Sequence, residues 1–431
     1  MSLDSDLRVK CGRRTTKSVS LYPIAARRVS MSRVRRCLPA EKAAALNRLT
    51  HSAHSMLQAY VAYTFLPSIG SMKNTVWAEV NLSAIRDNLA AIRHLCPRSR
   101  IMAVIKADGY GHGLLAVAAA MRDADGFAVA RLQEAIKLRT AGIKQRVLLL
   151  GTLLDLQDLA LCGALEIDIV VHDESSLAAI LAQARRTPLR VWLKLDTGMH
   201  RIGFDCDAFK AADRVLSVHP GILELIHMTH LSSADNPESG VTDDQLSKFW
   251  KCRSGCSQTA TSVANSAALL TSSRTHTEWV RPGLLLYGER PLAGGHLLSL
   301  RLAMRVRAAI IAVRRLETGE SVGYNGRWTA GRSSRIGTIG MGYADGYPRH
   351  AKDGTPVWVN GVLVPLVGQV SMDSLTVDLT ECPGAEVGDN AILWGPELAP
   401  RIVARSADSI AYQLFTTLGE RVGREYVDMP Q

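Results

Sequence analysis

Lys106 ends a short apolar run and is followed by a segment rich in glycine, in the stretch AVIKADGYGHG. If residues 103–105 form a buried strand, the amine lies at the end of that strand. A partly desolvated lysine there could form a Schiff base with a carbonyl compound. The alternative is a lysine in a salt bridge at a strand end. The glycines would let the backbone approach a ligand closely, and Tyr110 could offer its phenol to a phosphate.

Two further cations occur in KLDTGMHRIGF, residues 194–204. Lys194 and Arg201 are separated by a glycine-containing turn, so both side chains could face the same cavity. Two neighbouring cations repel each other, so one of them must be neutralised or held by an anion. A solvated loop with ordinary charges is the alternative interpretation.

Three more motifs contain residues that could bind or react. Arg281 follows an apolar run in VRPGLLLYG, where Gly283 offers a backbone amide beside it. Tyr343 lies between glycines in MGYADGYPR. Met372 lies in VGQVSMD, and its local context alone favours a core residue.

The elements that would position these residues are short and nearly all apolar. Eight such runs occur, at residues 101–106, 126–130, 147–151, 166–171, 190–195, 222–230, 262–266 and 278–283. Continuous apolar runs suit strands of a parallel sheet, and the stretches between them have helical composition. We therefore predict a (β/α)8 barrel. The polar residues lie at or just beyond the C-terminal ends of the runs, where such barrels carry their active sites.

After about residue 300 the pattern changes to strands broken by Gly, Pro and Asn-Gly turns. We expect a basic extension over residues 1–71, the barrel over 72–304, and a mostly-β domain over 305–431. Residues 406–418 are the exception in the last domain and are expected to be helical.

The net charge of +11 is concentrated at the N-terminus. Residues 1–74 hold 13 Lys and Arg against 3 Asp and Glu, whereas the remaining 357 residues hold 38 against 37. The near-neutral body does not predict a nucleic-acid partner. The extension could be a targeting segment, a basic tail, or sequence upstream of a native start at Met72. Its apolar run, 56–69, is too short to span a bilayer.

Eight cysteines are spread along the chain at positions 11, 37, 96, 162, 206, 252, 256 and 382. They form no CxxC pair and no zinc-site pattern. We expect reduced, structural thiols in a cytoplasmic protein that holds no metal.

Seven motifs resemble, in order and spacing, those of alanine racemases: AVIKADGYGHG, LKLDTGMHRIGF, THLSSAD, ANSAA, RPGLLLYG, GYADGYPR and VGQVSMDSLTVDL. The resemblance covers about residues 76–428. It implies a pyridoxal 5'-phosphate (PLP) enzyme that interconverts L- and D-alanine by a two-base mechanism, with D-alanine supplied for peptidoglycan in a bacterium. It also implies a barrel followed by a β domain, in a homodimer whose subunits share their active sites.

The resemblance assigns a role to each matching residue. Lys106 would hold PLP as an aldimine and act as one base, and Tyr343 of the partner subunit would act as the other. Arg201 would bind the cofactor's phenolic oxygen and the substrate carboxylate, with Lys194 carbamylated to orient it. The phosphate would be bound by Tyr110, Ser266, Tyr412 and the backbone amides of Gly283 and Leu284.

The remaining roles concern the electronics and shape of the site. Arg281 would face the pyridine nitrogen, and His230 would link Tyr343 to Arg281. Met372 would help to shape the substrate pocket of the partner. Gln369 departs from the family, in which many members have arginine at this position of the VGQVSMD motif.

Three alternatives remain open at this stage. A racemase of broader scope, for serine or basic amino acids, would differ in the width of its pocket. A barrel PLP decarboxylase would not explain GYADGYPR, and it would carry a cysteine motif in the β domain that this chain lacks. A PLP-binding homeostasis protein would resemble the barrel alone.

Overall fold

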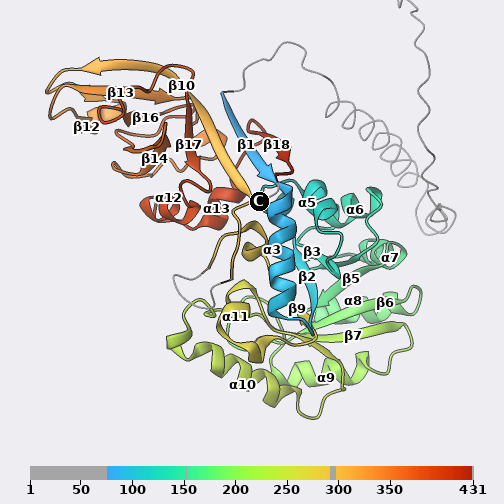
Figure 1. The fold of residues 1–431 in the computed structure, drawn as a ribbon. Helices are drawn as coiled ribbons and strands as arrows, with labels where there is room; N and C mark the ends of the chain where they lie inside the picture. The colour runs from blue at the N-terminus through green and yellow to red at the C-terminus, as the bar shows by residue number, and fades with distance from the viewer. Residues whose placement is uncertain (1–74, 152, 292–297, 430–431) are drawn as a thin grey trace, which may run out of the picture.

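The computed structural model describes residues 75–151, 153–291 and 298–429, which form a barrel and a mostly-β domain (Figure 1). The predicted extension over residues 1–71 lies outside the described residues, as do the apolar run within it and Met72. Among the described residues, no helix combines the length and apolar composition needed to cross a bilayer.

Eight parallel strands close into a barrel, which confirms the predicted fold class. The strands are β2 (Arg100–Val104), β3 (Gly126–Val129), β4 (Arg146–Leu149), β5 (Ile167–Val171), β6 (Leu189–Lys194), β7 (Ile222–Met228), β8 (Ala260–Ser262) and β9 (Trp279–Val280). Strand β8 ends earlier than predicted. Asn265 lies beyond it and caps the next helix, because its side chain accepts the amide of Ala268 at 3.0 Å.

Helices alternate with the barrel strands and surround them (Figure 1). They are α3 (Leu82–Leu95), α5 (Leu114–Ala120), α6 (Leu132–Thr140), α7 (Leu156–Ala164), α8 (Glu174–Ala184), α9 (Cys206–Leu216), α10 (Val241–Arg253) and α11 (Ser266–Thr271). Asp155, Asp173 and Asp205 cap α7, α8 and α9, each accepting a backbone amide of the first helical turn.

The second domain is built on a mixed sheet that includes the first strand of the described chain. Strand β1 (Val76–Asn81) pairs antiparallel with β10 (Met304–Leu316) and parallel with β18 (Gly423–Val427). The other main strands are β13 (Ser334–Ile339), β14 (Pro356–Val359), β15 (Val362–Pro365), β16 (Leu375–Asp378) and β17 (Asn390–Trp394). The sequence before the barrel therefore contributes to the β domain, which the sequence analysis did not anticipate.

The helix predicted over residues 406–418 was wrong as a single element. The structure has α12 (Pro400–Ser406) and α13 (Ala411–Thr416), with a turn between them. Asp408 in this turn has φ +46°, which no right-handed helix can accommodate.

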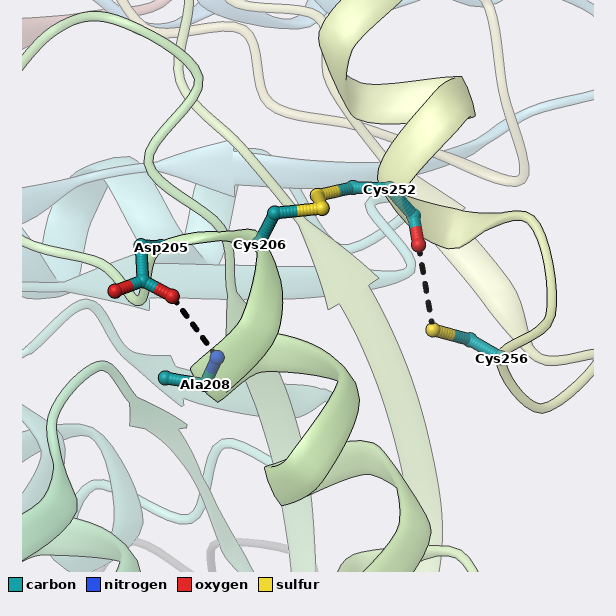
Figure 2. The surroundings of a disulfide bond; sticks show 5 residues. All are labelled: Asp205, Cys206, Ala208, Cys252 and Cys256. Carbon is teal, nitrogen blue, oxygen red and sulfur yellow. Dashed lines mark hydrogen bonds between the residues drawn. A yellow bond between two sulfur atoms is a disulfide. The ribbon is translucent and has the colours of Figure 1, made fainter.

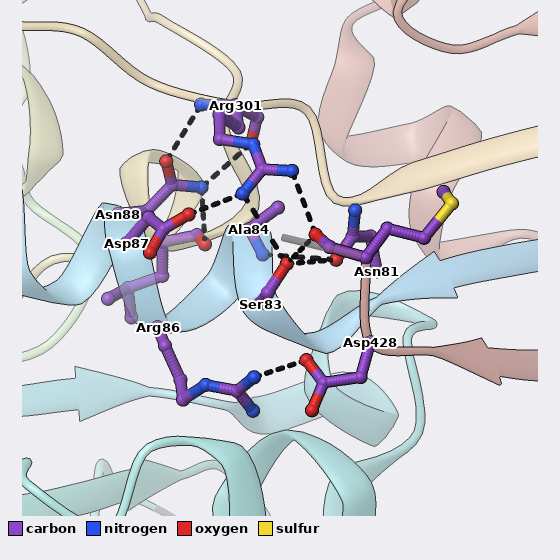
Figure 3. Close-up of polar contacts among 10 residues, drawn as sticks. Asn81, Ser83, Ala84, Arg86, Asp87, Asn88, Arg301 and Asp428 are labelled. Atoms are coloured by element: carbon purple, nitrogen blue, oxygen red, sulfur yellow. Dashed lines mark hydrogen bonds and ion pairs between the residues drawn. The ribbon is translucent and has the colours of Figure 1, made fainter. Parts of the chain in front are cut away.

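A polar joint connects the barrel to the chain segments that enter and leave the β domain (Figure 3). The side chain of Asn88 on α3 donates to the carbonyl of Arg301 at 2.8 Å and accepts the Arg301 amide at 2.8 Å. Arg301 also forms an ion pair with Asp87, and Arg86 pairs with Asp428. Helix α3 thus fastens both the chain before β10 and the chain after β18.

Among the cysteines in the described residues, Cys206 and Cys252 form a disulfide (Figure 2). The expectation that all the cysteines are reduced was therefore wrong for this pair. Cys206 begins α9 and Cys252 lies near the end of α10, and the packing of these helices brings their Cα atoms within 5.5 Å. The 46-residue separation hides this proximity from motif analysis. Cys96, Cys162, Cys256 and Cys382 are free.

Candidate active site

The chain makes an uncommon left-handed turn immediately after Lys106. Ala107, Asp108, Gly109, Tyr110 and Gly111 all have φ between +52° and +75°. For a residue with a Cβ this conformation costs roughly 1–2 kcal/mol, so the three non-glycine residues need support from their surroundings. The turn brings the phenol of Tyr110 back toward the end of β9, near the backbone of Gly283.

Hydroxyl groups and backbone amides converge beside Tyr110. The amide of Gly283 donates to Ser266 Oγ at 2.8 Å, and the rings of Tyr110 and Tyr412 lie 5.7 Å apart. A Cβ added to Gly283 would lie 2.6 Å from Tyr110 Oη, so only glycine leaves this space open. Leu284 begins a short 3-10 helix directly after it. These donors suit a small anion such as a phosphate group.

Four cations lie within electrostatic range of one another at the C-terminal ends of the strands. Lys194 is 5% exposed, and its burial, followed by Arg281 and Arg201, lowers its pKa to about 7. Burial also lowers the pKa of Lys106, as does the neighbouring Arg201. The structure thus brings together Lys106, Lys194 and Arg281 with Arg201, whose side chain is exposed in the isolated chain.

Arg281 follows β9 and is held by the ends of the two strands next to it in the barrel, β8 and β7. Its Nη2 donates to the carbonyl of Thr229 at 2.6 Å, and its Nη1 donates to Ser262 Oγ at 2.5 Å. Burial lowers its pKa to about 10, so the guanidinium remains charged at neutral pH. Nη2 also lies 3.4 Å from Nδ1 of His230.

His230 is neutral in this environment. Burial and then the surrounding cations, of which Arg281 is the strongest, lower its pKa well below the usual value. Because Nδ1 faces a guanidinium donor, we assign the ring proton to Nε2. His230 can therefore accept from Arg281 on one side and donate on the other.

Tyr343 and Met372 lie together on the β domain. The amide of Tyr343 donates to the carbonyl of Ser371 at 3.0 Å, and that of Ala344 donates to Met372 at 3.0 Å. Their side chains are exposed, by 38% for Tyr343 and 53% for Met372. Within the described part of the chain, no hydrogen bond joins either of them to the barrel residues His230 and Lys106.

A second exposed tyrosine, Tyr324, was missed by the sequence analysis. It lies in the turn Tyr324–Gly326 after β11 (Ser321–Val322) and is 68% exposed. The segment 369–372 lies beside this turn, because Arg327 donates to Gln369 Oε1 at 3.3 Å. Tyr324 and Tyr343 thus flank the same segment. The glycines that surround it in VGYNG could have indicated an exposed aromatic residue in a turn.

Comparison with known proteins follows the same division of the chain. The family models "Alanine racemase, N-terminal domain" and "Alanine racemase, C-terminal domain" match residues 80–291 and 303–426. An alanine racemase of Shewanella amazonensis is 45% identical over 360 residues, which cover 81% of this chain and 99% of the relative.

Solved structures agree with these matches. A biosynthetic alanine racemase from Pseudomonas aeruginosa has a TM-score of 0.80 at 44% identity, over 82% of this chain and 99% of the other. An alanine racemase from Bartonella henselae, with covalently bound pyridoxal phosphate, has a TM-score of 0.76 at 27% identity, over 82% and 99%.

Proposed function

The chain belongs to the alanine racemase family, and from this premise we propose that it is an isomerase that interconverts L- and D-alanine with the help of PLP. One observation carries the proposal. The buried amine of Lys106, whose pKa is lowered, lies at the start of the turn that brings Tyr110 to Gly283, where hydroxyl groups and backbone amides form a candidate phosphate site, called the phosphate cup below. The proposal includes a homodimer in the cytoplasm that supplies D-alanine for peptidoglycan.

The residues present fit the cofactor at both of its ends. Tyr110, Ser266 and Tyr412, with the amides of Gly283 and Leu284, would hold the phosphate, since the cup offers hydroxyls and backbone donors. Lys106 would hold the cofactor covalently, and Arg281 would face the pyridine nitrogen. When bound, PLP serves as the electron sink that stabilises a carbanion at the substrate's α-carbon.

The charge of Arg281 favours racemisation over other reactions. A guanidinium gives up its proton only at strongly alkaline pH, so Arg281 would only donate toward the ring nitrogen of a bound cofactor and would not supply a proton to it. Its burial and its bonds to Thr229 and Ser262 keep it in one position. By withholding a proton from the ring, Arg281 would favour prompt return of a proton to the α-carbon over transamination or decarboxylation.

Racemisation removes the α-proton from one face and returns a proton to the opposite face. We assign the first face to the amine of Lys106, whose lowered pKa makes the neutral base available nearer neutral pH. The opposite face needs a second base. We propose a phenol from the β domain of the partner subunit.

Two tyrosines are candidates for this phenol. The family motif assigns it to Tyr343, and its neighbour Met372 would line the partner's pocket. Tyr324 is the second candidate, because a side chain that enters a partner's site must be exposed on its own chain, and both Tyr343 (38%) and Tyr324 (68%) are exposed. In either case His230 would connect the phenol to Arg281.

Arg201 and Lys194 are proposed to bind the substrate side of the site. Arg201 would receive the substrate carboxylate and the cofactor's phenolic oxygen. With a pKa of about 7, a large fraction of Lys194 is neutral at neutral pH and can add carbon dioxide. The resulting carbamate is an anion, which would replace cation repulsion with attraction to Arg201 and hold it in place.

Exchange of the α-proton tests the proposed activity directly. The purified enzyme with PLP is incubated in deuterated water with a panel of L-amino acids, and deuterium incorporation is followed by proton NMR. Alanine should exchange and yield both enantiomers. Equal exchange of serine or basic amino acids would instead indicate a racemase of broader scope, and no exchange of any substrate would reject the proposal.

A further inference from the structure

The left-handed turn 107–111 is supported at its far end by the C-terminal part of the chain. Arg424 on β18 donates to the carbonyl of Gly111 at 3.1 Å. Helix α13 packs so closely that a Cβ on Gly111 would lie 1.9 Å from the carbonyl oxygen of Phe415. Neither contact reaches Ala107, the near end of the turn, which directly follows Lys106.

Glu134 on α6 provides that support. Its Oε1 accepts the backbone amide of Ala107 at 2.7 Å, across 27 residues of sequence. Its Oε2 accepts the amides of Ala130 and Arg131 at 2.9 and 3.0 Å, at the start of its own helix. The second set of bonds is an ordinary helix-capping interaction, whereas the first connects α6 to the residue next to Lys106.

The charge of Glu134 also acts on Lys106. Among the groups that shift the pKa of this amine, burial and Arg201 lower it, and Glu134 raises it. One carboxylate therefore contacts the backbone beside the amine and also balances part of the positive charge around it. A glutamine could not replace it fully, because its NH₂ group would face one of the backbone donors.

We propose that Glu134 is a positioning residue: it holds the near end of the left-handed turn so that Lys106 and Tyr110 face one cavity. This inference rests on the proposed function, in which these two side chains bind the same cofactor. The bond from Ala107 to Glu134 would exist before any cofactor binds, so the site would be organised in advance.

Hydrogen exchange of the apoprotein tests this preorganisation without reference to activity. Glu134→Gln should speed exchange of the Ala107 amide by about tenfold or more, read from peptides spanning 104–114, because the amide loses its charged acceptor. The matched control is Asp158→Asn, which removes the carboxylate at the same position of the next helix. Asp158 accepts only the amide of its own helix cap, Asp155, so exchange over 104–114 should not change.

The holoenzyme provides a second readout. In Glu134→Gln the visible absorption band of the lysine-bound cofactor should weaken and kcat for alanine should fall by about tenfold or more, with KM changed by less than about threefold. Glu134→Asp keeps the charge but withdraws it by one methylene, so it should behave like Glu134→Gln. It also serves as the test variant if Glu134→Gln does not fold, as judged by circular dichroism.

Three results would overturn the inference. The first is an Ala107 amide that exchanges at the wild-type rate in both Glu134 variants. The second is an equally large increase in exchange over 104–114 in Asp158→Asn. The third is a wild-type kcat in Glu134→Asp. If the wild-type protein bound no PLP and racemised no amino acid, the proposed function would be rejected instead. The hydrogen-exchange experiment on the apoprotein would still test whether Glu134 holds the turn.

Discussion

Nη2 of Arg281 lies 3.4 Å from Nδ1 of His230, and a fully buried guanidinium thus faces a neutral imidazole. Arg281 is fixed by strand ends β7 and β8, so the imidazole it contacts is also restrained. Both residues lie just beyond the C-terminal ends of barrel strands, β9 for Arg281 and β7 for His230, and the proposed phenol of a second subunit would approach at this end of the barrel.

Replacing Arg281 with glutamate should alter the outcome of the reaction as well as its rate. A carboxyl group can share a proton with the pyridine nitrogen, which strengthens the electron sink and lengthens the life of the carbanion. We expect racemisation to fall by roughly 100-fold, about 2.7 kcal/mol, with pyruvate formed per turnover by transamination. Arg281→Lys is the control that keeps a cation. If the glutamate variant forms no more pyruvate per turnover than the wild type, this role for Arg281 is wrong.

The two exposed tyrosines can be separated by single substitutions to phenylalanine. Loss of a general base costs about 10²–10⁴ in rate, and here the loss should affect proton removal from one enantiomer far more than from the other. We expect this asymmetric loss in Tyr343→Phe, the tyrosine that the family motif assigns, and a small, symmetric effect in Tyr324→Phe. The measurement is α-proton exchange from L- and D-alanine separately. The opposite result would assign the base to Tyr324.

Gly283→Ala should weaken cofactor binding. The new Cβ would lie 2.6 Å from Tyr110 Oη and would push the phenol out of the proposed phosphate cup. We expect the Kd for PLP, measured by fluorescence titration of the apoprotein, to rise by about tenfold or more. Gly331→Ala is the matched control, because a Cβ there meets nothing within 4 Å. Equal PLP affinity in Gly283→Ala and the wild type would argue against the phosphate site.

Lys194 should make stability depend on pH when carbon dioxide is excluded. Its pKa is about 7 in the folded chain, against 10.5 for an unperturbed lysine. Between these values the unfolded chain binds more protons, so the free energy of unfolding should rise with pH across this window, by up to roughly 5 kcal/mol. The gain is lost as the pH falls toward 7.

Lys194→Met should abolish this contribution to the rise in the free energy of unfolding with pH. The measurement is urea unfolding of the wild-type and variant apoproteins at pH 7 and 9. Added bicarbonate should stabilise the wild type near pH 7 and leave the methionine variant unaffected, because only a lysine can form the carbamate. Equal slopes in the two proteins would contradict the lowered pKa.

The barrel could be predicted because its strands are buried on both faces and read as continuous apolar runs, as in 147–151 and 190–195. The polar residues that follow these runs could be placed at the C-terminal end of the barrel, because all the strands of such a barrel run in the same direction. Strand β1, in contrast, pairs with β10 more than two hundred residues away, and no local pattern reveals that partner. The same holds for the Cys206–Cys252 pair, which depends on how α9 packs against α10.

The positions of the candidate site residues could be inferred from the sequence where a motif follows an apolar run, but not where a turn or a long-range contact sets them. Lys106 and Arg281 follow apolar runs, so their position at the barrel mouth could be inferred. Glu134 lies in an ordinary helical stretch, and only the fold shows that one of its oxygens reaches Ala107. Tyr324 lies in a short glycine-containing turn whose exposure the sequence does not show.

Mixed dimers test the central claim, that each site combines an amine from one subunit with a phenol from the other. Lys106→Ala subunits are refolded in equal amounts with Tyr324→Phe subunits, and in parallel with Tyr343→Phe subunits. If the bases come from different subunits, half the dimers are mixed and each has one intact site, so the pair with the correct tyrosine variant should recover about one quarter of wild-type racemisation. No recovery with either tyrosine variant, while each parent is inactive alone, would show that both bases belong to one chain and would contradict the account.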